Sequence, residues 1–237
     1  MPGRRPASPA ARAVAYVLVV AIAVAVPALL VVTGFRVLAT DTYVRWELDR
    51  DGFPPDRYGL SDREREELAL LGLRSIEPGS EGIVLLERAT LPDGSPAFDE
   101  RELSHMRDVR TLFGAALRGQ LIAVVAITVL ALALAWTSLR TVVPRGLLAG
   151  ALATLAIAVL AVPFIVLGFD RFFTRFHEVF FEADSWRFSN TDTLIRIYPE
   201  RFWQDVAQLV AAIAVAQAIV LALLAWWWLR AAKRRLA

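Results

Sequence analysis

Four long apolar runs alternate with segments that are rich in charged residues. The runs lie at residues 13–35, 119–139, 146–169 and 206–229, and none of them contains a charged side chain. A helix of about 20 apolar residues is long enough to cross the hydrocarbon core of a bilayer. The pattern therefore predicts a polytopic membrane protein with four transmembrane helices.

The charges between these runs are distributed unevenly. Segments 1–12, 140–145 and 230–237 contain nine basic residues and no acidic residue, whereas all 24 acidic residues lie in segments 36–118 and 170–205. Basic residues concentrate on the cytoplasmic side of membrane proteins. Both termini and the 140–145 loop are therefore predicted to be cytoplasmic, with the two acidic segments on the outer face. The nine basic residues are Arg4, Arg5, Arg12, Arg140, Arg145, Arg230, Lys233, Arg234 and Arg235.

The first apolar run has two interpretations. Val37-Leu38-Ala39 resembles a cleavage site for signal peptidase, but the run exceeds the roughly 7–15 apolar residues of a signal-peptide core. A retained membrane anchor is the favoured interpretation.

Turn and capping signals divide segment 36–118 into elements of an outer cap. Ser61 with Glu64 predicts a helix up to about Leu71, with Gly72 as its stop. The run 83–90 contains residues that favour strands and predicts a strand, followed by a turn at 92–94. A second capping pattern predicts a helix over 100–117 that leads directly into the second span. The expected fold is thus mostly α: four transmembrane helices and a small mixed α/β extracellular cap.

Small residues in the third run predict how it packs. Gly146 and Gly150 are four residues apart, so they lie on one helix face and allow a close approach of another helix.

Composition excludes several kinds of chemistry. The chain has no cysteine, which rules out disulfides, thiolate nucleophiles and cysteine metal ligands. The net charge of only +2 gives no reason to expect a nucleic-acid partner. Sequence fingerprints of serine hydrolases, phosphate-binding loops and dinucleotide sites are also missing. The apolar runs lack ionisable residues, which argues against an ion-coupled transporter.

Segment 170–205, the aromatic outer segment, carries the strongest functional signal. Eleven of the chain's 24 aromatic residues lie between Phe169 and Trp203, and one of its two histidines, His177, lies among them. The other, His105, precedes the second span on the same predicted side. The two imidazoles could therefore meet where the cap reaches the membrane. A shared acid–base role requires that they lie within roughly 10 Å of each other, because both must reach the reacting atoms.

A metal site is a less favoured interpretation of the same residues. His177-Glu178 begins like a helical zinc motif, but Phe181 stands where the second histidine would be. Catalytic zinc usually has three protein ligands, and aromatic surroundings suit it poorly. Neither a metal nor another cofactor is predicted.

Several motifs around these histidines resemble those of one known family. Phe176-His177-Glu178-Val179-Phe180-Phe181, Asp184-x-Trp186, Thr191-Asp192-Thr193-Leu194-Ile195 and Pro199-Glu200-x-Phe202 resemble the lipoprotein intramolecular transacylases. Glu102-Leu103-x-His105-Met106-x-Asp108-Val109 resembles the first histidine motif of that family. Motif order, spacing and four-span topology agree over most of the chain, but not over the cap before about Leu60, nor at 185–190, where a proline would be expected.

The resemblance implies an activity and a site. Such enzymes move the sn-2 acyl chain of a diacylglyceryl-modified lipoprotein to the α-amine of its N-terminal cysteine, using two catalytic histidines, here His105 and His177. The partners would be diacylglyceryl-modified lipoproteins and membrane lipid. Asp108 is expected to orient His105, directly or through a water, because it follows three residues later on one helix. The candidate substrate-binding residues are Phe173, Phe176, Phe180, Phe181, Trp186 and Arg196.

Two other functions remain open on the sequence. The protein could bind a lipid or protein partner through its cap without catalysis, or it could be another hydrolase or acyltransferase that uses the same histidines. Mass spectrometry of a reporter lipoprotein would distinguish these possibilities.

Overall fold

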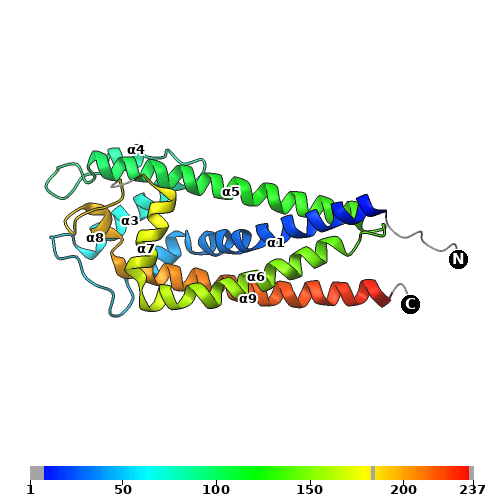
Figure 1. Ribbon diagram of the computed structural model, residues 1–237. Helices are drawn as coiled ribbons and strands as arrows, with labels where there is room; N and C mark the ends of the chain where they lie inside the picture. The colour runs from blue at the N-terminus through cyan, green and yellow to red at the C-terminus, as the bar shows by residue number, and fades with distance from the viewer. Residues whose placement is uncertain (1–7, 183–184, 235–237) are drawn as a thin grey trace. The chain divides into compact units, whose positions relative to one another are not determined.

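The computed structural model describes residues 8–182 and 185–234. Arg4, Arg5, Arg235 and the motif residue Asp184 lie outside the described residues. The described chain forms helices α1 (Pro9–Leu38), α2 (Asp41–Leu48), α3 (Asp62–Ile76), α4 (Val84–Glu87), α5 (Glu100–Leu134), α6 (Val142–Leu167), α7 (Phe169–Phe180), α8 (Thr193–Ile197) and α9 (Glu200–Arg234) (Figure 1).

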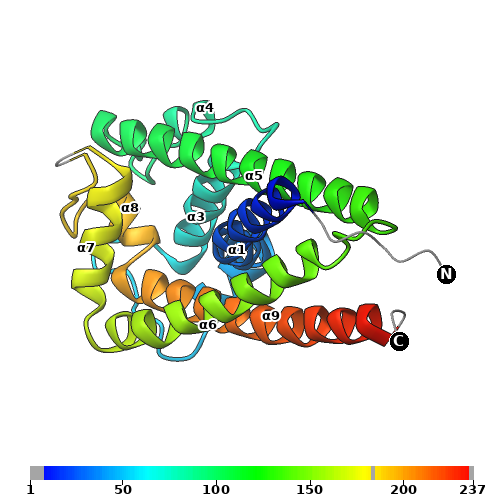
Figure 2. The same ribbon diagram turned by 45° about the vertical axis from the view of Figure 1, so that its right-hand side comes forward.

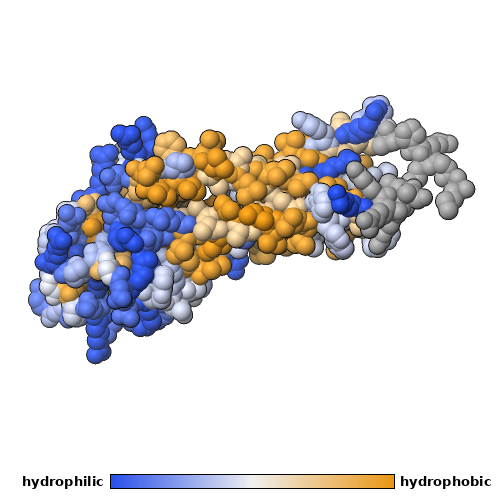
Figure 3. Space-filling view, turned by 90° about the horizontal axis from the view of Figure 1, so that it is seen from below, coloured by the Kyte–Doolittle hydropathy of each residue, from blue (hydrophilic) through white to orange (hydrophobic). Residues whose placement is uncertain are grey.

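Four of these helices, α1, α5, α6 and α9, are long and apolar enough to cross a membrane. Large apolar side chains on them, such as Val24, Leu132 and Leu160, are exposed. Figure 3 shows these helices covered mainly by hydrophobic residues, while hydrophilic residues dominate the surface of the cap. A lipid-facing surface accounts for this pattern, since a soluble protein rarely exposes so much apolar area. The ends of α1, α6 and α9 lie within six residues of the predicted spans, whereas α5 joins the helix predicted over 100–117 to the second span.

The chain divides into two compact units, and each is described by itself. The first unit, the helical bundle, comprises the chain up to Gly34, Gly119–Ala161 and the chain from Ala211. The packing expected from the small residues of α6 is confirmed. A Cβ atom added to Gly146 would lie 2.7 Å from Cβ of Ile22. One added to Gly150 would lie 2.5 Å from Cβ of Val26. The two glycines therefore let α6 pack directly against α1.

The second unit, the cap unit, comprises Phe35–Arg118 and Val162–Val210. The capping box of α3 is confirmed, because Ser61 and Glu64 exchange hydrogen bonds with each other's backbone N–H. The predicted stop at Gly72 is wrong, since α3 continues to Ile76 and buries Gly72 against the ring of Tyr198. In both views α3 lies beside α8 (Figures 1 and 2).

The strand predicted over 83–90 is also wrong. Residues 84–87 form the single helical turn α4, with Leu86 fully buried, and the rest of this run is irregular. Across the described residues no strand is present, only an isolated bridge between Thr90 and Pro96. A strand needs a partner along its length, and this run pairs only at its end, so a helical turn satisfies most of its backbone groups locally. The cap unit is therefore helical rather than mixed α/β.

A buried charged cluster joins α2 to the start of α9. Glu47 has no solvent exposure and accepts hydrogen bonds from the hydroxyl of Tyr43, at 3.3 Å, and from Arg50, at 2.9 Å. Arg50 also pairs with Asp205, which Arg201 contacts at 2.6 Å. Each buried carboxylate thus has a cationic partner, as low-polarity surroundings require.

Candidate active site at two stacked histidines

The first histidine is positioned by the start of α5. Asp99 and Glu102 form a reciprocal cap, because the side chain of each accepts a 2.8 Å hydrogen bond from the backbone N–H of the other. This confirms the predicted capping signal. One turn further along, His105 points inward with its residue 8% exposed. Leu103 and Met106 are buried on the same part of the helix.

The second histidine is positioned by the amphipathic helix α7. His177 is also 8% exposed, and its Nδ1 lies 2.8 Å from the carbonyl oxygen of Phe173, one turn earlier. A carbonyl oxygen only accepts hydrogen bonds, so Nδ1 must carry the proton. In the neutral imidazole this leaves Nε2 as the atom with a free lone pair.

The two imidazoles lie against each other. Their ring centroids are 6.0 Å apart and their planes are inclined by 27°. This separation is within the roughly 10 Å that a shared acid–base role allows, so both rings can reach one reacting group. The structure thus brings together the two histidines that the sequence singled out, although they are 72 positions apart along the chain.

An aromatic shell surrounds the pair. Phe181 contacts both rings, at 4.9 Å from His105 and 5.3 Å from His177 between centroids. Three further rings lie near His177: Phe173 at 4.0 Å, Trp186 at 4.7 Å and Phe176 at 5.5 Å. Phe188 lies 5.4 Å from His105. These walls limit the access of water to the imidazoles.

Burial in this shell changes the acid–base properties of His177. Desolvation disfavours the charged imidazolium and lowers the pKa of His177 below its usual 6.5, although the hydrogen bond to Phe173 acts in the opposite direction. His177 is therefore neutral at pH 7, with Nε2 able to accept a proton. Burial, with a smaller contribution from His177, lowers the pKa of His105 as well, to about 4. Among the described residues, Nδ1 of His105 has no hydrogen-bond partner.

Three of the predicted site residues lie outside the shell around the two histidines. Phe180 is about half exposed and contacts Phe176 rather than either histidine. Arg196 is paired with Asp56 in a separate cavity of the cap unit. Asp108 is exposed and does not contact Nδ1 of His105, so the predicted direct contact is wrong. Three helix positions leave Asp108 about 60° from the direction of His105, which is enough to turn it toward solvent. Its orientation of His105 through a water stays a prediction.

The loop after α7 is fixed to α5 by polar contacts that the sequence did not reveal. Glu102 accepts a 2.7 Å hydrogen bond from the backbone N–H of Leu194, at the start of α8. Asp192 pairs with Arg101 at 2.7 Å, and the hydroxyl of Thr193 donates to the carbonyl oxygen of Ala97. These bonds hold the segment that carries Trp186 and Phe188 against the helix of His105. Only the capping pattern at 99–102 hinted at a role for Glu102.

Within residues 8–182 and 185–234, no group of three or more His, Cys, Asp or Glu side chains is arranged to hold a metal ion. The candidate site consists of the two imidazoles and the aromatic rings around them.

Comparison with known proteins decides the family. A family model for the lipoprotein intramolecular transacylase Lit matches residues 85–203, which include both histidines. An Aquifex aeolicus protein described as uncharacterized is 32% identical over 179 residues, covering 76% of this chain and 79% of that protein. The chain belongs to the Lit family.

Solved structures agree with this membership at the level of the fold. The integral membrane Lit of Bacillus cereus superimposes with a TM-score of 0.76 at 16% identity, covering 94% of this chain and 99% of that one. A variant of that protein with a substituted histidine gives a TM-score of 0.66 at 14% identity, covering 94% of this chain and 96% of that one. This Lit-family protein therefore shares the Lit fold.

Proposed function

We propose that this protein transfers the sn-2 acyl chain of a diacylglyceryl-modified lipoprotein to the α-amine of its N-terminal cysteine. The observation that carries the proposal is the stacked, buried pair of histidines inside an aromatic shell. Membership of the Lit family supports the class of reaction and of substrate. The bacterial cell membrane would be the site of action, with both termini cytoplasmic and the cap unit on the outer face.

His177 serves as the general base in this proposal. The amine nitrogen attacks the ester carbonyl carbon, a C–N bond forms, and the amine gives up a proton. An α-amine titrates near 7.7–8.0, so at neutral pH a neutral imidazole can accept that proton. Nε2 is the available nitrogen, because Nδ1 donates to Phe173. When the C–O bond breaks, the leaving sn-2 oxygen is protonated and the lyso-form lipoprotein results.

His105 serves as proton donor or stabiliser of the oxyanion. Its ring lies beside that of His177, so both can reach the same tetrahedral intermediate. An N–H donor aimed at developing negative charge is worth more in a site shielded from water. The shell of Phe173, Phe181 and Trp186 would also exclude the water that could hydrolyse the ester.

No enzyme nucleophile is needed, because donor and acceptor belong to one molecule. Good orientation of two such groups can supply about 7–11 kcal/mol of the barrier. This agrees with a chain that has no cysteine.

Mass spectrometry of a reporter lipoprotein tests the proposal. Cells that express the protein should yield the N-acylated lyso-form, and cells without it should not. His105→Ala and His177→Ala should each lower transfer by about 10²–10⁴-fold, the usual contribution of a general acid or base. His177→Asn is a control for folding. The Asn amide can still donate a hydrogen bond to the carbonyl group of Phe173, but it has no basic nitrogen to accept a proton in place of Nε2.

Two results would contradict the proposal. A double alanine variant with wild-type yield would remove the histidine mechanism. Release of free fatty acid without N-acylation would indicate a hydrolase instead. The proposed orientation is tested separately by a reporter fused after Ala237, which should be cytoplasmic.

A further inference from the structure

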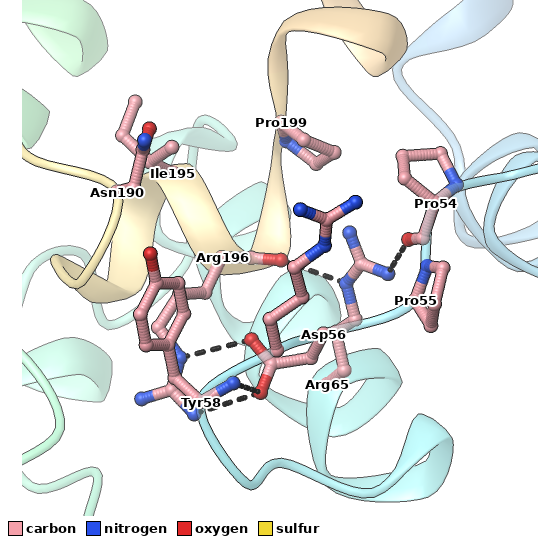
Figure 4. A pocket seen from close by; sticks show the side chains of 10 residues that line it. Pro54, Pro55, Asp56, Tyr58, Arg65, Asn190, Ile195, Arg196 and Pro199 are labelled. Carbon is pink, nitrogen blue, oxygen red and sulfur yellow. Dashed lines mark hydrogen bonds and ion pairs between the residues drawn. The ribbon is translucent and has the colours of Figure 1, made fainter.

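A second polar site lies in the cap unit, apart from the histidines. It is a cavity of about 210 Å³ between the segment before α3 and the segment around α8 (Figure 4). Two of its arginines, Arg65 and Arg196, come from α3 and α8 respectively. Its lining residues are Pro54, Pro55, Asp56, Arg57, Tyr58, Arg65, Asn190, Ile195, Arg196 and Pro199.

Arg65 is a buried cation without a carboxylate partner. The residue is 4% exposed, and it donates hydrogen bonds to two backbone carbonyl oxygens, of Arg196 at 2.7 Å and of Pro54 at 2.6 Å (Figure 4). Its guanidinium also lies 4.9 Å from the ring centre of Phe53. Among the described residues, none forms an ion pair with Arg65. A buried, permanently charged group is costly unless an anion compensates it.

The one carboxylate of the cavity is already committed. Asp56 accepts two hydrogen bonds from Arg196, at 3.0 and 3.1 Å, and two more from the backbone N–H groups of Tyr58 and Leu60. Desolvation raises its pKa, but these four donors outweigh that effect and lower the pKa to about 2. Asp56 therefore stays ionised and pairs with Arg196. It also acts electrostatically on Arg65, as does Asp62 at the start of α3.

Arg57 adds a second uncompensated charge. It lines the cavity, its side chain is exposed, and within the described part of the chain it has no ion pair. Three arginines and one aspartate thus line the cavity, and even with Asp62 nearby the local charge stays positive, which favours an anionic ligand. The planar guanidinium group matches the oxygens of phosphate, and a nearby exposed arginine can close over a bound anion.

The position of the cavity along the chain indicates the source of the phosphate. Pro199 lines it, and the membrane-length helix α9 begins at the next residue. The apolar part of α9 starts at Val206, six residues after Glu200, which is a rise of about 9 Å. The headgroup layer on each side of a bilayer is about 5–8 Å thick. The start of α9 therefore lies at the outer edge of the headgroup layer, within reach of a lipid headgroup.

We propose that this cavity binds the phosphate of an anionic phospholipid headgroup. Arg57 and Arg65 supply the positive charge, and Asn190 lines the same cavity. The proposal goes beyond acyl transfer and does not depend on it.

Calorimetric titration of the full-length protein in a neutral detergent tests this site. The probes are dihexanoyl phosphatidylglycerol, dihexanoyl phosphatidylcholine and inorganic phosphate. Phosphatidylglycerol should bind at saturation with one lipid per chain, and the zwitterionic lipid more weakly. Arg57→Gln should raise the dissociation constant for phosphatidylglycerol about tenfold, which corresponds to about 1.4 kcal/mol.

The matched control is Arg63→Gln, which removes the same charge from an exposed arginine that pairs with Glu67. It should leave binding unchanged. Arg65 is left intact in this test, because it also bonds to two carbonyl groups and its loss could unfold the cap unit. Equal binding of phosphatidylglycerol by wild type and Arg57→Gln would overturn the proposal.

The other probes separate the sources of the anion. If inorganic phosphate binds as tightly as phosphatidylglycerol and displaces it, the site takes free phosphate and the assignment to a lipid is wrong. If phosphatidylglycerol does not bind to the wild-type protein, the assignment to a lipid is likewise wrong.

Discussion

Glu102 connects the two halves of the candidate active site, and its replacement should be measurable. The side chain accepts hydrogen bonds from two backbone N–H groups, of Asp99 at 2.8 Å and of Leu194 at 2.7 Å. The first starts the helix of His105, and the second fixes the start of α8. In Glu102→Gln one oxygen remains, and the new NH2 group faces an N–H donor.

The expected loss of stability follows from the number of hydrogen bonds that Glu102 accepts. A hydrogen bond to a charged group contributes about 1.5–3 kcal/mol. In a protein of this size, about 1 kcal/mol changes the unfolding midpoint by about 2–4 °C. The midpoint of Glu102→Gln should therefore fall by about 3–12 °C. Acyl transfer should fall as well, because the loop with Trp186 and Phe188 is held less firmly against His105.

Thermal unfolding in detergent, followed by tryptophan fluorescence, measures this effect. The control is Glu100→Gln, which makes the same chemical change on the same helix at an exposed ion pair with Arg107. Exposed pairs contribute little, so this variant should melt close to wild type. If the two variants melt at the same temperature, the buried contacts of Glu102 do not hold α8 as described.

Three further predictions concern packing and protonation. Gly150→Ala should destabilise the protein by about 1–3 kcal/mol, because the new Cβ would overlap Val26. Its control, Gly119→Ala, has open space at that position and should not destabilise. The native pKa of His177 lies below the unfolded value, so unfolding midpoints should fall as pH drops below about 6.5, and less so in His177→Phe. Burial and a neighbouring carboxylate raise the pKa of Glu47 from 4.5 to about 7, so this group should cost the wild type stability as pH rises from about 4.5 to 7, a contribution that Glu47→Gln should lack.

The elements that follow from local chemistry could be predicted from the sequence. The four apolar runs correspond to four long helices because span length is set by the bilayer itself. The caps at Ser61 and Asp99 form because their partners lie three residues away. The close packing at Gly146 and Gly150 follows from the absence of side chains on one face.

The errors arise where distant residues decide the outcome. The run at 83–90 has strand-forming residues, but no second strand lies beside it, so Leu86 is buried on a helical turn instead. Gly72 does not stop α3, because Tyr198 packs against it from another part of the chain. Contacts at long range leave no local pattern, which is why propensity failed at both places.

The candidate site could be predicted only in part, because long-range contacts leave no local pattern in the sequence. Both histidines stood out because the chain has only two, and their neighbours along α7 share a face. Phe188 was one aromatic among eleven, with no pattern to mark it as a contact of His105. The pairing of Arg196 with Asp56, 140 positions earlier, could not be read from either segment alone.

The hydrogen bond from Nδ1 of His177 to Phe173 also fixes the route of a proton through the ring. With one nitrogen held by a carbonyl group, a proton that arrives at Nε2 must also leave from Nε2. In the proposed reaction, a proton that His177 takes from the amine at Nε2 would have to leave from the same edge of the imidazole before the next turnover. His177 is therefore reset only when that edge is open to a proton acceptor.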